Sequence, residues 1–246
     1  MQPLFNGHGE CLDATFHPGR AGDRRVVVIA HGVTSHKDRP WLIALSEHLA
    51  ASEIASLRIS FAGNGQSQGR YEDVTISKEV ADLSSVLDAL AGHAVIYAGH
   101  SMGAAVGVLC AARDARIRGL VSLAGMVHVS AFMHAQFGHL RPGVDVKLGK
   151  PQCPLTQRFL DDAHAIGDVL APAACVRVPW LLVHGTADEL VPLQDALDAQ
   201  RAAAGKPALV TLTGADHRFG GQEEAMAKVV TRWIEGAIPP SDVTGT

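Results

Sequence analysis

The sequence predicts an α/β fold in which helices flank a mostly parallel sheet. Short apolar runs rich in β-branched residues alternate along the chain with amphipathic helical segments, and glycine-rich turns follow several of these runs. Continuous apolar runs are typical of parallel strands that are covered on both faces. The 246 residues are enough for a large core and lie within the range that α/β folds commonly occupy as one domain, so we expect a single domain over residues 1–246.

The first half of the chain contains the clearest alternation. Pro40 is suited to the first turn of a helix, and apolar residues three or four positions apart mark the helical segments. The expected elements, in order, are a strand over 25–30, a helix over 40–49, a strand over 55–61, a helix over 76–90, a strand over 94–98, a helix over 104–112 and a strand over 119–123.

The alternation stops in the segment 126–172, where glycines, prolines and scattered histidines are frequent. We interpret this segment as an insertion within the domain. The alternation then resumes with a strand over 180–183, a helix over 193–203, a strand over 208–212 and a helix over 222–235. The tail 239–246 is expected to be frayed.

Composition excludes several classes of function. The net charge of −4, without a block of like charge, gives no basic surface for nucleic acid, and no apolar run reaches the roughly 18 residues of a membrane span. The cysteines and histidines lack the spacing of metal or redox motifs, so we expect no metal. The first residues lack the pattern of a secretory signal, which favours a cytoplasmic location.

Residues 99–103 form a G-x-S-x-G pattern centred on Ser101. A sharp turn between a strand and a helix presents such a serine as a nucleophile, and the glycines let neighbouring backbone pass without clashes. The pattern alone is weak, because chance produces it in about one chain in eight at this composition. Here an expected strand precedes it and an expected helix follows it, which is the context that the chemistry requires.

A serine nucleophile needs a base and an acid that orients the base, and in this arrangement both come later in the chain, acid first. Asp188 and His217 each follow an expected strand, in that order. Glu189 and Asp216 are alternative acids. Asp216 adjoins the histidine in sequence and is poorly placed to reach its ring, and Glu189 would require a different turn.

The transition state also needs N–H donors for the developing oxyanion. Met102 supplies one at the start of the helix after Ser101, and the loop after the first core strand supplies the other, for which we choose Val33. His31 and His100 flank these donors and are expected to be scaffold. The glycine-rich segment 63–69 lacks the lysine of a phosphate-binding loop and is expected to be a tight loop beside the site.

With these motifs in place, the sequence resembles the α/β-hydrolase superfamily, and within it the small serine esterases that include cinnamoyl and feruloyl esterases. The resemblance covers nearly the whole chain and rests on residues 31–38, 60–67, 99–103, 184–192 and 214–217. It implies a triad of Ser101, Asp188 and His217, oxyanion donors at Val33 and Met102, and no cofactor. The family usually carries an acidic residue where this chain has Ser60.

The resemblance also implies that the segment 126–172 is a small cap over the serine, which excludes water and selects the substrate. Its apolar residues are candidates either for the walls of the substrate pocket or for the core of the cap: Phe132, Met133, Phe137, Leu140 and Phe159.

The resulting hypothesis is a carboxylic-ester hydrolase that forms an acyl-enzyme with a small ester, aromatic or short-chain in its acyl group. Thioester, lactone or peptide-like amide cleavage would use the same residues. A ligand-binding or sensor protein with this fold and little turnover is an alternative from another class. The expected partner is a small molecule, and the oligomeric state is left open between a monomer and a homodimer.

Overall fold

The central sheet has seven strands in the order β3-β5-β4-β6-β7-β8-β9 in a computed structural model, which describes residues 2–240. The strands are β3 (Ala14–His17), β4 (Arg25–Ala30), β5 (Ala55–Ile59), β6 (Ala94–His100), β7 (Ile117–Leu123), β8 (Trp180–Gly185) and β9 (Ala208–Leu212). All neighbouring pairs are parallel except the edge pair β3 and β5. The chain therefore builds one side of the sheet from β4 to β5 and then returns to add β6 on the other side. Ligands of open α/β sheets bind where the strand order reverses in this way.

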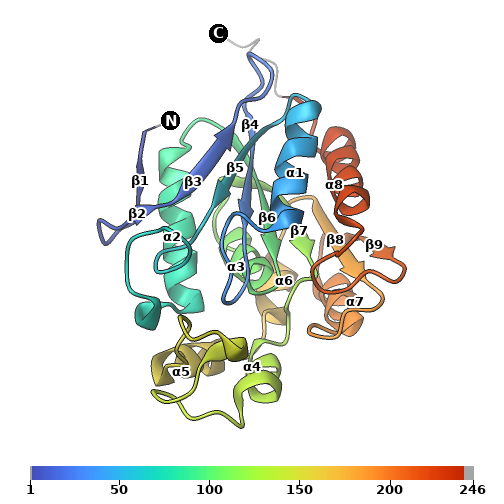
Figure 1. Ribbon diagram of the computed structural model, residues 1–246. Coiled ribbons are helices and arrows are strands. Elements are labelled where there is room, and N and C mark those ends of the chain that lie inside the picture. Colours follow the sequence, from blue (N-terminus) through green and yellow to red (C-terminus); the bar gives the residue numbers. More distant parts are fainter. Residues whose placement is uncertain (1, 241–246) are drawn as a thin grey trace.

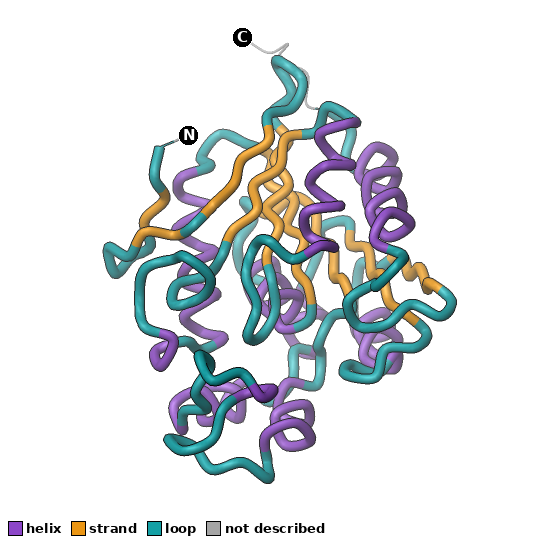
Figure 2. Tube along the Cα trace, in the orientation of Figure 1, coloured by secondary structure: helices purple, strands orange, loops and turns teal. Residues whose placement is uncertain are grey.

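Helices cover both faces of this sheet (Figures 1 and 2). One face is covered by α1 (Pro40–Ala51) and α8 (Glu223–Ala237), which lie side by side. The other face is covered by α2 (Ile76–Ala89), α3 (Met102–Ala111), α6 (Leu170–Cys175) and α7 (Leu193–Ala202). The buried apolar residues accordingly form two clusters, one on each side of the sheet. The predicted fold class is confirmed.

The expected strands and helices occur with shifts of a few residues at their ends. The sequence did not indicate β1 (Leu4–Phe5), β2 (Cys11–Leu12) or β3, because these strands are short and several of their residues are partly exposed, so they lack a continuous apolar run. The expected frayed tail lies outside the described residues from position 241 onward.

The segment 126–172 contains more regular structure than its composition indicated. It holds α4 (Val129–Phe137), the short helix η2 (Lys147–Gly149), α5 (Gln157–Ile166) and the start of α6. The Thr156 hydroxyl caps α5 by accepting a hydrogen bond from the Phe159 N–H at 3.3 Å, which favours helix formation at that point. In Figure 1, α4 and α5 lie together beyond one end of the sheet.

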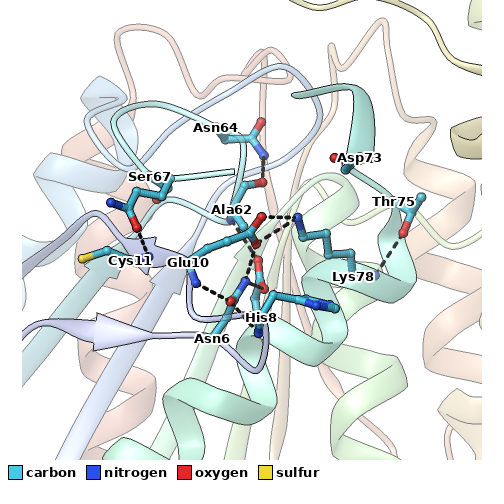
Figure 3. A network of polar contacts seen from close by, with 12 residues as sticks. Asn6, His8, Glu10, Cys11, Ala62, Asn64, Ser67, Asp73, Thr75 and Lys78 are labelled. Carbon is cyan, nitrogen blue, oxygen red and sulfur yellow. Dashed lines mark hydrogen bonds and ion pairs between the residues drawn. The ribbon is translucent and has the colours of Figure 1, made fainter. Parts of the chain in front are cut away.

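A polar network fastens the N-terminal hairpin of β1 and β2 to α2 and to the chain after β5 (Figure 3). The Asn6 side-chain amide donates to Glu10 and to Asp82, both at 2.7 Å, and Lys78 forms an ion pair with Glu10 at 2.9 Å. The second Asp82 oxygen accepts the Ala62 N–H at 2.8 Å. The network thereby holds the start of the glycine-rich segment 63–69 against the core.

Candidate active site

Ser101 lies at the turn between β6 and α3, at the carboxyl end of a central strand. Its backbone has φ +55° and ψ −120°, a conformation that a residue with a side chain adopts only when its surroundings enforce it. The surroundings do so through close backbone packing: a Cβ on Gly99 would lie 2.3 Å from the Gly103 carbonyl oxygen, and a Cβ on Gly103 would lie 2.3 Å from that of His31. Both glycines of the pattern are therefore required.

The Asp188 carboxylate lies against the His217 ring. His217 Nδ1 is 2.8 Å from Asp188 Oδ2, and the Asp188 side chain is 0% exposed. The same oxygen is 3.3 Å from Nε2 of His184, and Oδ1 accepts the N–H groups of Leu190 and Val191 at 2.9 Å each. With four contacts on two oxygens, the carboxylate has a single orientation, which directs it at the histidine ring.

These contacts keep the Asp188 carboxylate ionised. Burial by itself would raise the pKa of Asp188, but the hydrogen bonds with His184 and His217 outweigh burial and lower the pKa well below its usual range. Neither alternative acid takes this place. Glu189 is exposed, and Oδ1 of the exposed Asp216 accepts two backbone N–H groups of its own loop.

The two expected oxyanion donors lie on adjoining segments of backbone. A Cβ on Gly32 would be 2.8 Å from the Ser101 Cβ and 3.3 Å from the Met102 nitrogen, so the loop after β4 packs directly on the serine turn. As the first residue of α3, Met102 has no intrahelical acceptor for its N–H. Within residues 2–240, the Val33 N–H donates no hydrogen bond either. Both donors are thus available to a ligand at this point.

Two buried histidines, both uncharged, hold the surrounding loops in place. His31 Nε2 accepts the Phe61 N–H at 3.1 Å, so Nδ1 carries the proton and donates to the Gly32 carbonyl at 2.9 Å. His100 Nε2 donates to the His217 carbonyl at 2.8 Å, and its ring packs 4.8 Å from the His217 ring. Burial lowers the pKa of His31 to about 4 and the pKa of His100 to about 3. Both rings therefore fix backbone while remaining uncharged.

A pocket of about 450 Å³ opens over Ser101 and His217. Val33 and Phe132 line it as well, so the structure brings together the serine, the histidine, one expected donor and one expected wall residue. The segment 63–69 does not border this pocket. Side chains that the sequence did not single out also line it, and they come from four separate parts of the chain: Arg39, Trp41, Leu148, Lys150, Leu190 and Arg218.

The other four candidate wall residues do not line this pocket. Phe137 and Phe159 are fully buried, with ring centroids 6.3 Å apart, and Phe137 packs against Phe132 at 6.2 Å. Met133 is buried in the same cluster, and Leu140 is half-buried against it. These four side chains form the apolar interior of the segment 126–172, and Phe132 lies between that interior and the pocket. From the sequence, the spacing of these apolar residues is equally compatible with the interior of the segment and with the wall of the pocket.

Residues 2–240 contain no group of three or more His, Cys, Asp or Glu side chains arranged to hold a metal ion. In the same part of the chain, no helix combines the length and apolar character needed to cross a membrane.

Comparison with known proteins places the chain among hydrolases. Residues 21–153, more than half of the chain, match the protein family described as serine aminopeptidase, S33. The mitochondrial palmitoyl-protein thioesterase ABHD10 of Bos taurus is 23% identical over 228 residues, which cover 86% of this chain and 72% of the bovine protein. The human protein of that name is 24% identical over 229 residues, with the same coverage of 86% and 72%.

Solved structures show the same fold. The ferulic acid complex of Est1E from Butyrivibrio proteoclasticus superposes with a TM-score of 0.86 at 23% identity, covering 97% of this chain and 99% of that one. Mouse alpha/beta hydrolase domain-containing protein 10 superposes with a TM-score of 0.77 at 22% identity, covering 96% and 97%. The predicted α/β-hydrolase fold is thus confirmed by proteins of distant sequence.

Proposed function

Because the chain belongs to the serine aminopeptidase S33 family of α/β-hydrolases, we propose that it hydrolyses carboxylic esters through an acyl-enzyme formed on Ser101. The observation that carries the proposal is the 2.8 Å contact between His217 and a fully buried, ionised Asp188, in a pocket that Ser101 and His217 both line. Family membership supports hydrolysis but leaves the leaving group open. The residues of the pocket are therefore the main guide to the substrate.

In the proposed mechanism, the Ser101 hydroxyl attacks the carbonyl carbon of the ester while its proton passes to Nε2 of His217. The Asp188 carboxylate accepts the Nδ1–H of His217, which selects the reactive tautomer and stabilises the imidazolium. The Val33 and Met102 N–H groups donate to the oxyanion. The imidazolium then protonates the leaving alcohol. A water molecule, deprotonated by His217, attacks the acyl carbon, the bond to Ser101 Oγ breaks to release the acid, and His217 returns the proton to Oγ.

The segment 126–172 is proposed to act as a cap within a single domain. Three of its residues, Phe132, Leu148 and Lys150, line the pocket that contains Ser101, as do Trp41 and Leu190. A volume of about 450 Å³ with aromatic and aliphatic walls is suited to a small ester with an aromatic or short-chain acyl group. Because these walls lie on a segment separate from the sheet, substitutions in that segment would alter the substrate preference without altering the triad.

Thioester hydrolysis is a second candidate, and the observation that favours it is the match to relatives named as palmitoyl-protein thioesterases. The same residues would act, with a thiol as the leaving group. Those names also place the relatives in mitochondria. For this chain, location in the cytoplasm and the choice between a monomer and a homodimer stay predictions.

The test is labelling with a fluorophosphonate probe together with hydrolysis of 4-nitrophenyl acetate. Wild-type protein should be modified at Ser101, and Ser101→Ala and His217→Ala should each lower kcat by about 10⁶. Circular dichroism and urea unfolding should show that both variants fold. Wild-type protein that neither labels nor turns over would favour the ligand-binding alternative, and full activity in Ser101→Ala, purified free of host esterases, would refute the mechanism.

A further inference from the structure

Three cationic side chains line the pocket that contains Ser101: Arg39, Lys150 and Arg218. They come from distant parts of the chain, namely the residue before α1, the loop after η2 and the residue after His217. Most other arginines that the structure describes have a carboxylate partner, but within residues 2–240 none of these three lies within 4.0 Å of a carboxylate. The pocket therefore gathers positive charges that have no carboxylate partner in the part of the chain that the structure describes.

Two of the cations meet at one backbone oxygen. Lys150 Nζ donates to the Thr34 carbonyl at 2.7 Å, and Arg39 donates to the same oxygen at 3.4 Å. Arg39 Nε also donates to the Ser35 hydroxyl at 3.0 Å, which holds the guanidinium in place. Thr34 directly follows Val33, the proposed oxyanion donor. The two charges thus meet at the carbonyl of the residue that follows the proposed donor, through contacts that leave other N–H groups of each side chain free.

The two carboxylates of the pocket neutralise this group only in part. Asp216 and Glu223 line the same pocket, but Oδ1 of Asp216 already accepts two backbone N–H groups, that of Arg218 at 2.9 Å and that of Gly220 at 2.8 Å. Three cations and two carboxylates leave an excess of one positive charge, in a protein whose net charge is −4.

The cations also affect one another. Burial and the charge of Arg218 lower the pKa of Arg39, and burial and the charges of Arg39 and Arg218 lower the pKa of Lys150. Charges that repel each other at short range are stabilised by a bound anion.

We infer that Arg39, Lys150 and Arg218 bind an anionic oxygen group of the substrate, so that the preferred ester or thioester carries a carboxylate or a phosphate. This inference rests on the proposed function and names its substrate class. A guanidinium matches the two oxygens of either group, and the lysine adds a point charge. An anion held there would orient the rest of the substrate relative to Ser101, which raises the rate by positioning.

The test compares kcat/KM for matched pairs of substrates. One pair is 4-nitrophenyl hemiglutarate and 4-nitrophenyl valerate, which differ by a carboxylate on the acyl group. The other pair is the acetyl thioesters of 4′-phosphopantetheine and of pantetheine, which differ by a phosphate on the leaving group. The pair with the larger anionic preference identifies the source of the anion.

Arg218→Gln should lower the ratio of anionic to neutral kcat/KM at least about tenfold, because a charge-assisted hydrogen bond is lost. Lys150→Gln should lower the same ratio, and Lys150→Arg should restore it. Arg232→Gln and Lys228→Gln are matched controls, since both residues are exposed on α8 and do not line the pocket, and they should leave the ratio unchanged. Raising NaCl from about 0.05 M to about 0.5 M should reduce the anionic preference of the wild type alone.

An unchanged ratio in Arg218→Gln and Lys150→Gln, in protein whose hydrolysis depends on Ser101, would overturn this inference and leave the proposed function standing. A wild type without a preference for either anionic substrate would overturn it equally. Loss of the proposed function is seen separately, as activity on the neutral esters that survives Ser101→Ala.

Discussion

Two parts of the molecule border the same pocket. One is the sheet with the turns that carry Ser101, Asp188 and His217, here called the framework, and the other is the segment 126–172. They hold their side chains by different means. In the framework, backbone packs on backbone at the carboxyl ends of the strands, and Asp188 has four polar contacts. In the segment 126–172, the Lys147 side chain is fully buried, and its Nζ has no hydrogen-bond partner among residues 2–240. This Nζ lies 3.6 Å from the centre of the Phe159 ring and 4.7 Å from that of Tyr71.

The difference shows in the charges as well as in the packing. Burial lowers the pKa of Lys147 to about 8, although Cys153 and Glu79 oppose this shift. In the framework, by contrast, hydrogen bonds outweigh burial at Asp188. Directional contacts leave little room for substitution, whereas apolar contacts around a pocket accept other side chains of similar volume. We therefore expect framework substitutions to remove activity and substitutions in the segment 126–172 to redirect it.

Among variants that keep Ser101 and His217, the largest effect is expected for Asp188→Asn, which should lower kcat on 4-nitrophenyl acetate by about 10⁴ without unfolding the protein. The amide cannot select the Nδ1–H tautomer of His217 or stabilise its charged form. Steady-state kinetics measure kcat, and urea unfolding measures the free energy of unfolding. Glu189→Gln is the matched control, because Glu189 is exposed and adjacent, and a reversed result would assign the acid to Glu189.

The second-largest effect is expected on stability at low pH, and it concerns His31, one of the two neutral histidines of the framework. Because the pKa of His31 is about 4 in the folded protein, against an ordinary value of 6.5, the unfolded chain binds more protons between these pH values. Its contribution to stability is therefore complete above pH 6.5 and is lost as the pH falls towards 4.

Between pH 7 and pH 4, the free energy of unfolding should consequently fall by about 3 kcal/mol more in the wild type than in His31→Gln. Urea unfolding at a series of pH values measures this fall in each protein. Ile29→Val, a buried change in β4, should lower stability equally at each pH. Parallel pH profiles for the wild type and His31→Gln would show that His31 is not kept neutral by the fold.

The smallest effect is expected in the segment 126–172. Phe132→Ala should lower kcat/KM about tenfold for an aryl-acyl ester while changing that for the acetate ester little, because only the larger acyl group contacts the ring. Parallel assays with both esters measure it. Leu140→Ala is the control within the same segment, since Leu140 does not line the pocket. Equal losses on both esters would mean that Phe132 supports the fold rather than selecting the substrate.

Much of the framework could be predicted from the sequence because its signals are local. The apolar run 25–30 and the glycines around Ser101 indicate a buried strand and a sharp turn without knowledge of distant residues. The placement of Asp188 and His217 after later strands then follows from the way parallel strands share one edge of a sheet. The choice of Asp188 over its neighbour Glu189 was weaker, because it depends on side-chain directions within one turn.

Other features depend on contacts between residues far apart in sequence. Lys150 reaches the Thr34 carbonyl across 116 positions, and no periodicity indicates such a pair. The same holds for Phe159, which packs inside the segment 126–172 while Phe132 faces the pocket.

By itself, then, the sequence determined the α/β framework, the serine and histidine of the candidate triad and a preferred acid among three, because strand patterns and turn glycines act over a few neighbouring residues. Only the tertiary structure decided which of these acids meets His217, which aromatic side chain borders the pocket, and that three cations line it. Those outcomes depend on the packing of distant segments, in which burial and charge are set by neighbours that the local sequence does not specify.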